Sequence, residues 1–249
     1  MLRIGHKGAD AIVPGNSIES FRAAVEAGVD VIEFDVLRPP EDFADGSDWR
    51  NASAGPAGGA GPILIAHDWA AARGAASPLT LDQALDAFTQ APLDEVKIDL
   101  DIKICGREDE IAEAIRSRGL AERTMTSGTE LPTIRALGDL APEFTRGWTI
   151  PRVSRDWTKS RVGKPFVLAG MAAYRARLPR IVRRDAPSLG VQAVWTHHGL
   201  ATPALAEAAH DSGCILVAWT VDDARRMLEL DAMGVDGICT NDPRLFATL

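Results

Sequence analysis

The sequence is poor in cysteine and tyrosine and has no apolar run long enough to span a membrane. It has 249 residues with 3 cysteines and 1 tyrosine, and 6% of its residues are aromatic. Cys105, Cys214 and Cys239 are odd in number and lie in apolar or strand-end contexts, so we interpret them as buried thiols instead of a disulfide framework or metal ligands. A membrane span needs about 20 consecutive apolar residues, so no integral membrane association is expected.

Positive charge is also scarce, because 27 lysines and arginines face 35 acidic residues and give a formal net charge of -8. This balance argues against a protein that grips the phosphate backbone of nucleic acid. Strand-like sequence begins at Leu2 and leaves no room for a secretory signal, so a cytoplasmic location is expected.

Short apolar runs alternate with amphipathic helices along the chain. The clearest helices are expected at 17–27, 80–90, 107–118, 202–211 and 222–233, and eight strands at 2–6, 31–37, 95–103, 123–127, 145–150, 193–198, 215–221 and 237–241. Eight strand and helix units in one domain over residues 1–249 predict a (β/α)8 TIM barrel. The alternative, a doubly wound sheet, more often stops at five or six strands.

Boundary signals support this count. Asn16 with Glu19 three residues later predicts a capping box, and Gly28 is expected to end the same helix. Further glycines are expected to end three other helices: Gly119, Gly213 and Gly234. The stretch 38–62 is rich in Gly, Ala, Pro and Asp without any period, and we interpret it as a small insertion after strand two that stands over the barrel mouth.

The strand at 95–103 alternates apolar and charged residues. Its apolar set is expected to face the helices outside a barrel, and its charges to point inward: Lys97, Asp99, Asp101 and Lys103. Buried charges are costly unless they are paired or bind a metal, so we expect these four charged side chains to have oppositely charged partners or a bound metal. The alternative is a charged ladder on an exposed edge strand.

The strand at 31–37 supplies such a partner. Glu33 and Asp35 lie two residues apart on one face near its carboxyl end, where two carboxylates repel each other unless a cation neutralises them. With Asp101 from the neighbouring strand, three oxygen ligands would converge. A ligand set made of carboxylates, without Cys or obvious His partners, favours a hard cation, Mg2+ or Ca2+.

Two of the five histidines, His6 and His67, end strands beside these acids. A lone histidine there is often only hydrogen-bonded, but a pair beside three carboxylates suits general acid and base catalysis near neutral pH. His197 and His198 are pocket candidates of lower rank, and His210 is expected on the surface or in packing.

The order of these motifs resembles the glycerophosphodiester phosphodiesterase family over nearly the whole chain. That family carries His-Arg-Gly after strand one, Pro-Glu-Asn-Thr before the first helix, Glu-x-Asp on strand two, His-Asp after the insertion and Glu-x-Lys on strand three. Here the corresponding pieces are His6-Lys7-Gly8, Pro14-Gly15-Asn16-Ser17, Glu33-Phe34-Asp35, His67-Asp68 and Asp101-Ile102-Lys103. The stretch beginning VAWTV near the carboxyl end is similar to the family's closing pattern.

The resemblance implies a TIM barrel enzyme that hydrolyses small glycerophosphodiesters to glycerol 3-phosphate and an alcohol. It implies that a divalent cation, Mg2+ or Ca2+, binds the three acids and that the two histidines are the general acid and base. Lys103, Lys7 and Trp219 are the expected substrate and phosphate contacts, and Trp195 is a second stacking candidate. The alternatives are a related phospholipase D-like enzyme or cyclising lyase, or a weakly active phosphodiester-binding protein.

Three residues depart from the family pattern: Lys7 replaces Arg, Gly15 replaces Glu, and Asp101 replaces Glu. Lysine keeps the charge of arginine but loses its two-pronged grip on phosphate. Whether Lys7 faces the pocket is open, because His6 takes the inward position of the strand, while Gly8 lets the backbone turn. A pocket role is preferred.

Overall fold

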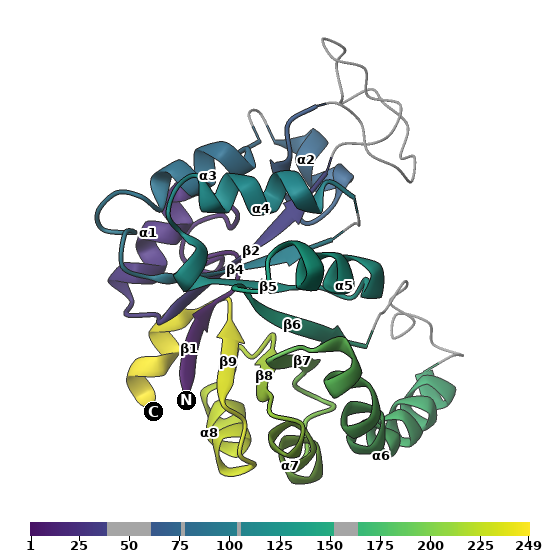
Figure 1. Cartoon of the computed structure of the whole chain (residues 1–249). Helices are drawn as coiled ribbons and strands as arrows, with labels where there is room; N and C mark the ends of the chain where they lie inside the picture. The colour runs from purple at the N-terminus through teal and green to yellow at the C-terminus, as the bar shows by residue number, and fades with distance from the viewer. Residues whose placement is uncertain (39–60, 76–77, 104–105, 152–163) are drawn as a thin grey trace.

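The computed structural model describes residues 1–38, 61–75, 78–103, 106–151 and 164–249 as a barrel of parallel strands wrapped by helices (Figure 1). The strands are β1 (Leu2–Gly5), β2 (Val31–Leu37), β3 (Leu64–Ile65), β4 (Lys97–Ile102), β5 (Thr124–Ser127), β6 (Thr145–Ile150), β7 (Ala193–His197), β8 (Ile215–Trp219) and β9 (Gly237–Thr240). All except β3 pair in parallel, and pairing of β1 with both β9 and β2 closes the ring. The predicted (β/α)8 barrel is confirmed.

The helices are α1 (Ile18–Glu26), α2 (Trp69–Gly74), α3 (Leu81–Ala87), α4 (Glu108–Arg116), α5 (Leu131–Leu140), α6 (Lys164–Leu189), α7 (Pro203–Asp211) and α8 (Ala224–Ala232). Short 3-10 helices cover Ala121–Arg123 and Pro243–Thr248. The predicted strands and helices are present, most of them a residue or two shorter at an end. Four elements were not predicted from the sequence. They are the helices α2, α5 and α6, and the two-residue strand β3, which pairs antiparallel with the end of β2.

The alternation in β4 separates the two faces of the barrel wall. Ile98, Leu100 and Ile102 are at most 1% exposed and pack into the layer between strands and helices. In the same layer Phe34 of β2 stacks on Phe88, with 5.6 Å between ring centroids. Removing this apolar surface from water holds the helices on the barrel and directs the alternate residues of each strand inward.

The helix caps correct one expectation. Ser17, not Asn16, is the N-cap of α1, because the Ser17 side chain accepts a hydrogen bond from the Ser20 backbone N–H. Asn16 has a positive φ of 56° and uses its side chain elsewhere, as described below. The glycines expected to end helices do adopt the left-handed backbone typical of that position: Gly28, Gly119, Gly213 and Gly234.

The remaining sequence expectations concern the insertion, the cysteines and the membrane. Residues 39–60 of the predicted insertion lie outside the described residues, as does Cys105. Cys214 and Cys239 are buried free thiols, as predicted. None of the helices in the described ranges combines the length and apolarity that crossing a membrane requires.

Candidate active site

A cavity of about 300 Å³ opens at the carboxyl ends of the barrel strands, the face on which enzymes of this fold carry their chemistry. Seven of the eight residues proposed from the sequence line it: His6, Lys7, Glu33, His67, Asp101, Lys103 and Trp219. The eighth, Asp35, contacts Lys103 from the adjacent wall. The other lining residues are Ser127, Thr129, Thr149, Pro151, Trp195, Thr220 and Cys239.

Three carboxylates meet at one side of this cavity. Glu33, Asp35 and Asp101 each offer an oxygen, and these oxygens lie within 4.8 Å of one another. The register of the sheet produces this arrangement, because Asp35 of β2 pairs directly with Asp101 of β4. No other group of three potential metal-ligating side chains occurs in the part of the chain that the structure describes.

Lys103 is the positive charge that faces the acids. Its Nζ lies 2.7 Å from Asp35 Oδ1 and also contacts Asp101 Oδ2. Burial alone would lower the pKa of Lys103, but the carboxylates of Asp101 and Asp35 raise it above its usual value, so the ammonium stays charged. Lys97, which was expected to point inward on the same strand, is instead exposed because it stands at the strand's amino end.

The surroundings of the two acids of β2 shift their pKa values in opposite directions. Burial raises the pKa of Glu33, and the charge of Asp35 raises it further. Burial also raises the pKa of Asp35, but Lys103 and a hydrogen bond from Asn16 outweigh burial and keep that pKa below its usual value. A Glu33 carboxyl that resists ionisation beside an ionised Asp35 is typical of an acid cluster that a further cation would stabilise. The all-oxygen donor set therefore fits a hard divalent cation.

Asn16 is a site residue that the sequence reasoning assigned to the wrong role. Its side-chain Nδ2 donates to Asp35 Oδ2 at 2.8 Å, and its Oδ1 accepts from the Asp35 backbone N–H at 3.1 Å. The signal was available, because asparagine tolerates the left-handed backbone that directs this side chain away from the helix and toward β2.

His6 directly follows β1 and is fixed by residues from the opposite end of the chain. Its Nδ1 lies 2.6 Å from Asn241 Oδ1, and Asn241 Nδ2 donates to Asp222 Oδ2 at 2.6 Å. An ionised carboxylate only accepts hydrogen bonds, so Asn241 must present its amide nitrogen to Asp222 and its oxygen to His6. His6 Nδ1 then carries the proton, and Nε2, 4.0 Å from Glu33 Oε2, is left as the acceptor.

Burial lowers the pKa of His6, which favours this neutral ring. The sequence reasoning missed both supporting residues. Asn241 directly follows β9, and Asp222 comes three residues after the end of β8; a position just after a barrel strand was the signal that could have found them.

His67 occupies a different environment. Its side chain is 55% exposed at the rim of the cavity, whereas the His6 side chain is 20% exposed. Its Nδ1 lies 3.1 Å from Asp68 Oδ2, and Asp68 is itself fixed as the N-cap of α2. The two histidines therefore reach the same cavity from the interior and from the solvent side.

The sequence left open whether Lys7 faces the cavity, and its backbone conformation accounts for its position. Its φ of 51° ends the strand alternation, so Lys7 lines the cavity although His6 already faces inward. Its backbone N–H donates to Glu33 Oε2 at 2.9 Å. Trp219 and Trp195 also line the cavity, from β8 and β7.

The lower-ranked histidines stay outside the lining of this cavity. His197 and His198 lie against each other with 4.5 Å between ring centroids, and His197 meets Trp219 edge-on at 5.7 Å. His210 binds Asp236 at 2.8 Å on the surface, as the sequence suggested.

Acid is expected to destabilise the fold partly through His197 and His198. Burial lowers the pKa of both rings; His197 and Arg226 lower that of His198 further, while Asp222 opposes them. Below the ordinary histidine pKa of about 6.5 the unfolded chain binds more protons than the folded one, so stability is lost as the pH falls.

We therefore expect the free energy of unfolding of His198→Gln to fall less between about pH 7 and about pH 5 than that of the wild type. Urea titrations at both pH values measure this difference. An equal fall in the two proteins would contradict the assignment.

A comparison with models of known protein families finds one family that matches most of the chain. The model of the glycerophosphoryl diester phosphodiesterase family matches residues 6–38 and 78–245. A search of the curated proteins finds none that matches.

Among solved structures, glycerophosphodiester phosphodiesterases from Agrobacterium tumefaciens str. C58 and Parabacteroides distasonis ATCC 8503 are similar to this chain. Both are 19% identical with a TM-score of 0.67; the first alignment covers 100% of each chain, and the second covers 98% of this chain and 96% of that one. An Oleispira antarctica phosphodiesterase in complex with the product sn-glycerol-3-phosphate is 17% identical with a TM-score of 0.66, over 98% of this chain and 94% of that one. At these identities the likeness establishes the fold.

Proposed function

Since the chain belongs to the glycerophosphoryl diester phosphodiesterase family and its enzyme class, we propose that it hydrolyses small glycerophosphodiesters to glycerol 3-phosphate and an alcohol. The observation that carries this proposal is the cavity that gathers three carboxylates, a buried lysine and two histidines at the carboxyl ends of the strands. The product bound to the Oleispira antarctica phosphodiesterase supports a small-molecule substrate. A cytoplasmic location and a single domain over residues 1–249 stay predictions.

Glu33, Asp35 and Asp101 are the residues proposed to hold a divalent cation, Mg2+ or Ca2+. When bound there, such an ion supplies positive charge that stabilises the phosphate oxygens as the reaction proceeds. Lys103 adds a fixed ammonium at the same place, and Lys7, which also lines the cavity, adds a second positive charge. Trp219 and Trp195, which line the cavity, are the aromatic side chains proposed to contact the organic part of the substrate.

We assign the base to His6 and the acid to His67. The Nε2 lone pair of His6 takes a proton from the nucleophile, whose oxygen then bonds to phosphorus; the nucleophile is water, or the glycerol 2-hydroxyl followed by a second step in which water opens the cyclic phosphate. The phosphorus–oxygen bond to the alcohol breaks, and His67 donates a proton to the departing oxygen. Burial lowers the pKa of His6, which favours its neutral ring, and Asp68 Oδ2, 3.1 Å from His67 Nδ1, orients the ring of His67.

Asn241→Leu is expected to lower kcat about 10- to 100-fold with little change in KM, the range found when a residue that orients a reactive side chain is removed. The loss follows because His6 Nδ1 would no longer have the acceptor that fixes its tautomer. Nitrogen NMR of the His6 ring should show Nδ1–H as the dominant form in the wild type and a mixture in the variant. An unchanged ring spectrum would contradict the assignment.

The reaction class is tested by its products. Hydrolysis of glycerophosphocholine should place a single solvent oxygen, labelled with ¹⁸O, in glycerol 3-phosphate, and a cyclic phosphate should appear only transiently, if the glycerol 2-hydroxyl is the nucleophile. Accumulation of a cyclic glycerophosphate would favour the cyclising lyase, and release of phosphocholine would reject the proposed bond cleavage. Binding of glycerophosphocholine without turnover would indicate a binding protein.

A further inference from the structure

The proposed function leaves unexplained how Lys7 is directed at the phosphate. Its backbone is fixed on both sides: its N–H donates to Glu33 Oε2 at 2.9 Å, and its carbonyl accepts from Ser20 Oγ at 2.9 Å and from the Asn16 N–H at 3.0 Å. The ammonium, however, stands at the end of a flexible four-carbon chain that has many rotamers. A fixed backbone alone does not place that charge.

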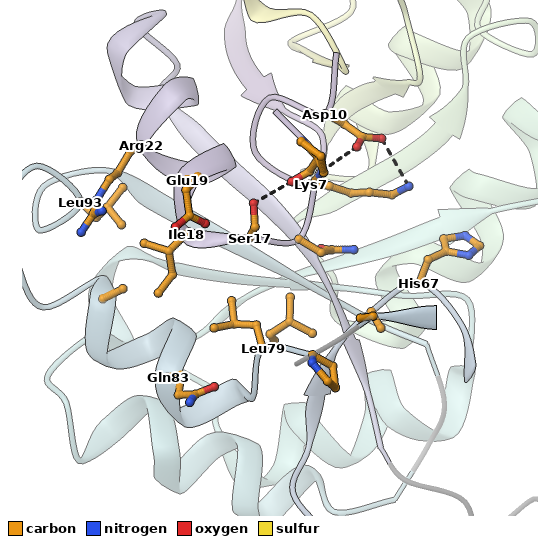
Figure 2. Close-up of a pocket in the computed structure, with 18 of the residues that line it drawn as sticks. Lys7, Asp10, Ser17, Ile18, Glu19, Arg22, His67, Leu79, Gln83 and Leu93 are labelled. Carbon is orange, nitrogen blue, oxygen red and sulfur yellow. Dashed lines mark hydrogen bonds and ion pairs between the residues drawn. The ribbon is translucent and has the colours of Figure 1, made fainter. Parts of the chain in front are cut away.

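Asp10 is the acidic neighbour of this ammonium. Asp10 Oδ2 lies 3.8 Å from Lys7 Nζ, while Asp10 Oδ1 accepts a hydrogen bond from the Gly15 backbone N–H at 2.7 Å (Figure 2). One oxygen is therefore tied to the loop and the other is aimed at the lysine. The side chains are only 34% and 21% exposed, which reduces screening of the pair by solvent.

Gly15 makes this arrangement possible. A Cβ at position 15 would lie 2.6 Å from Asp10 Oδ1 and 2.7 Å from Lys7 Cβ. The second contact involves an atom next to a fixed backbone, which cannot move away as the end of a side chain can. The carboxyl group of Asp10 therefore takes the space that a side chain at position 15 would need.

We propose that Asp10 is a positioning residue that holds the Lys7 ammonium at the edge of the cavity, and that Gly15 leaves room for it. This inference rests on the proposed function, because it gives Lys7 a role at the substrate phosphate. Lysine, unlike arginine, has no rigid planar fork, so an ion pair at its tip is the means by which its charge is directed. Asp10 does not touch the phosphate and acts only through Lys7.

The test is a double-mutant cycle of Lys7→Met and Asp10→Asn, assayed as kcat/KM for glycerophosphocholine and as the affinity for glycerol 3-phosphate by calorimetry. Asparagine keeps an oxygen for the Gly15 N–H and removes the charge facing Lys7. We expect losses in kcat/KM of about 100-fold for Lys7→Met, by analogy with removal of one oxyanion donor. We expect about 10-fold for Asp10→Asn, and in the double variant no further loss beyond that of Lys7→Met, because residues that act as a unit are not additive.

A merely structural role of Asp10 would give an equal loss in both backgrounds, and that result would overturn the proposal, as would unchanged activity of Asp10→Asn. Lys7→Met within threefold of wild type, with glycerol 3-phosphate still formed, would also overturn it while leaving the proposed hydrolysis in place. Failure of the wild type to form glycerol 3-phosphate would reject the hydrolysis itself; the calorimetric cycle would then decide the inference alone. Asp185→Asn is the matched control, because its carboxylate is similarly exposed, at 30%, and binds Arg184 on α6.

A substitution at position 15 tests the space that glycine leaves for Asp10. Gly15→Ala should lower kcat/KM at least as much as Asp10→Asn, because the added methyl group meets both the Asp10 carboxyl and Lys7 Cβ. Gly74→Ala is its control, since a Cβ there meets no atom within 4 Å. Wild-type activity of Gly15→Ala would contradict the role assigned to Gly15.

Discussion

Replacing His6 by alanine is expected to lower kcat about 1000-fold, within the range known for removal of a general base, while KM changes little. The reason is that His6 combines an interior position, a neutral ring and a tautomer fixed by Asn241, so no solvent group can replace its Nε2. Steady-state kinetics with glycerophosphocholine measure the effect.

His67→Ala is expected to cost less, about 100-fold, because at the exposed rim water can deliver part of the missing proton. His210→Ala is the matched control, since that imidazole binds Asp236 on the surface away from the cavity. A His6→Ala enzyme that keeps kcat within threefold of wild type would remove His6 from the chemistry. An equal, large loss in His210→Ala would point to misfolding instead.

Exhaustive removal of divalent cations is expected to abolish turnover to below about a thousandth of the starting rate, because the cation contributes several kcal/mol of charge stabilisation. Without it, Lys103 is left as the only lysine in direct contact with Asp35 and Asp101 among the described residues. Adding back Mg2+ or Ca2+ separately should restore the rate and identify the preferred ion.

The same prediction has a readout that does not depend on activity. Calorimetry should show one cation site per chain, weakened at least 10-fold in Asp101→Asn, because one of the three carboxylates loses its charge. Asp109→Asn, at an exposed position of α4, is the matched control and should bind the cation as the wild type does. Full turnover after chelation, or unchanged affinity in Asp101→Asn, would reject the metal site.

The sequence by itself determined the barrel and the acidic side of its cavity. Period-two alternation in β4 placed Ile98 and Leu100 outward and Asp101 inward, and that parity follows from strand geometry whatever the neighbours are. Glu33 and Asp35 share a face for the same local reason, and parallel pairing brings them beside Asp101. Eight such units left a closed barrel as the arrangement that covers every strand.

Only the tertiary structure decided how the site residues are held and how they differ. Asn16, assigned from local spacing to a helix cap, turns to Asp35, and Lys7 escapes strand alternation through its left-handed backbone. His6 and His67 look alike as strand-end histidines, yet one is enclosed and fixed by Asn241, 235 residues away in sequence. Closure of β9 against β1 creates that contact, and no pattern read along the chain contains it, because periodicity reports the face a residue takes and not the residue it will meet.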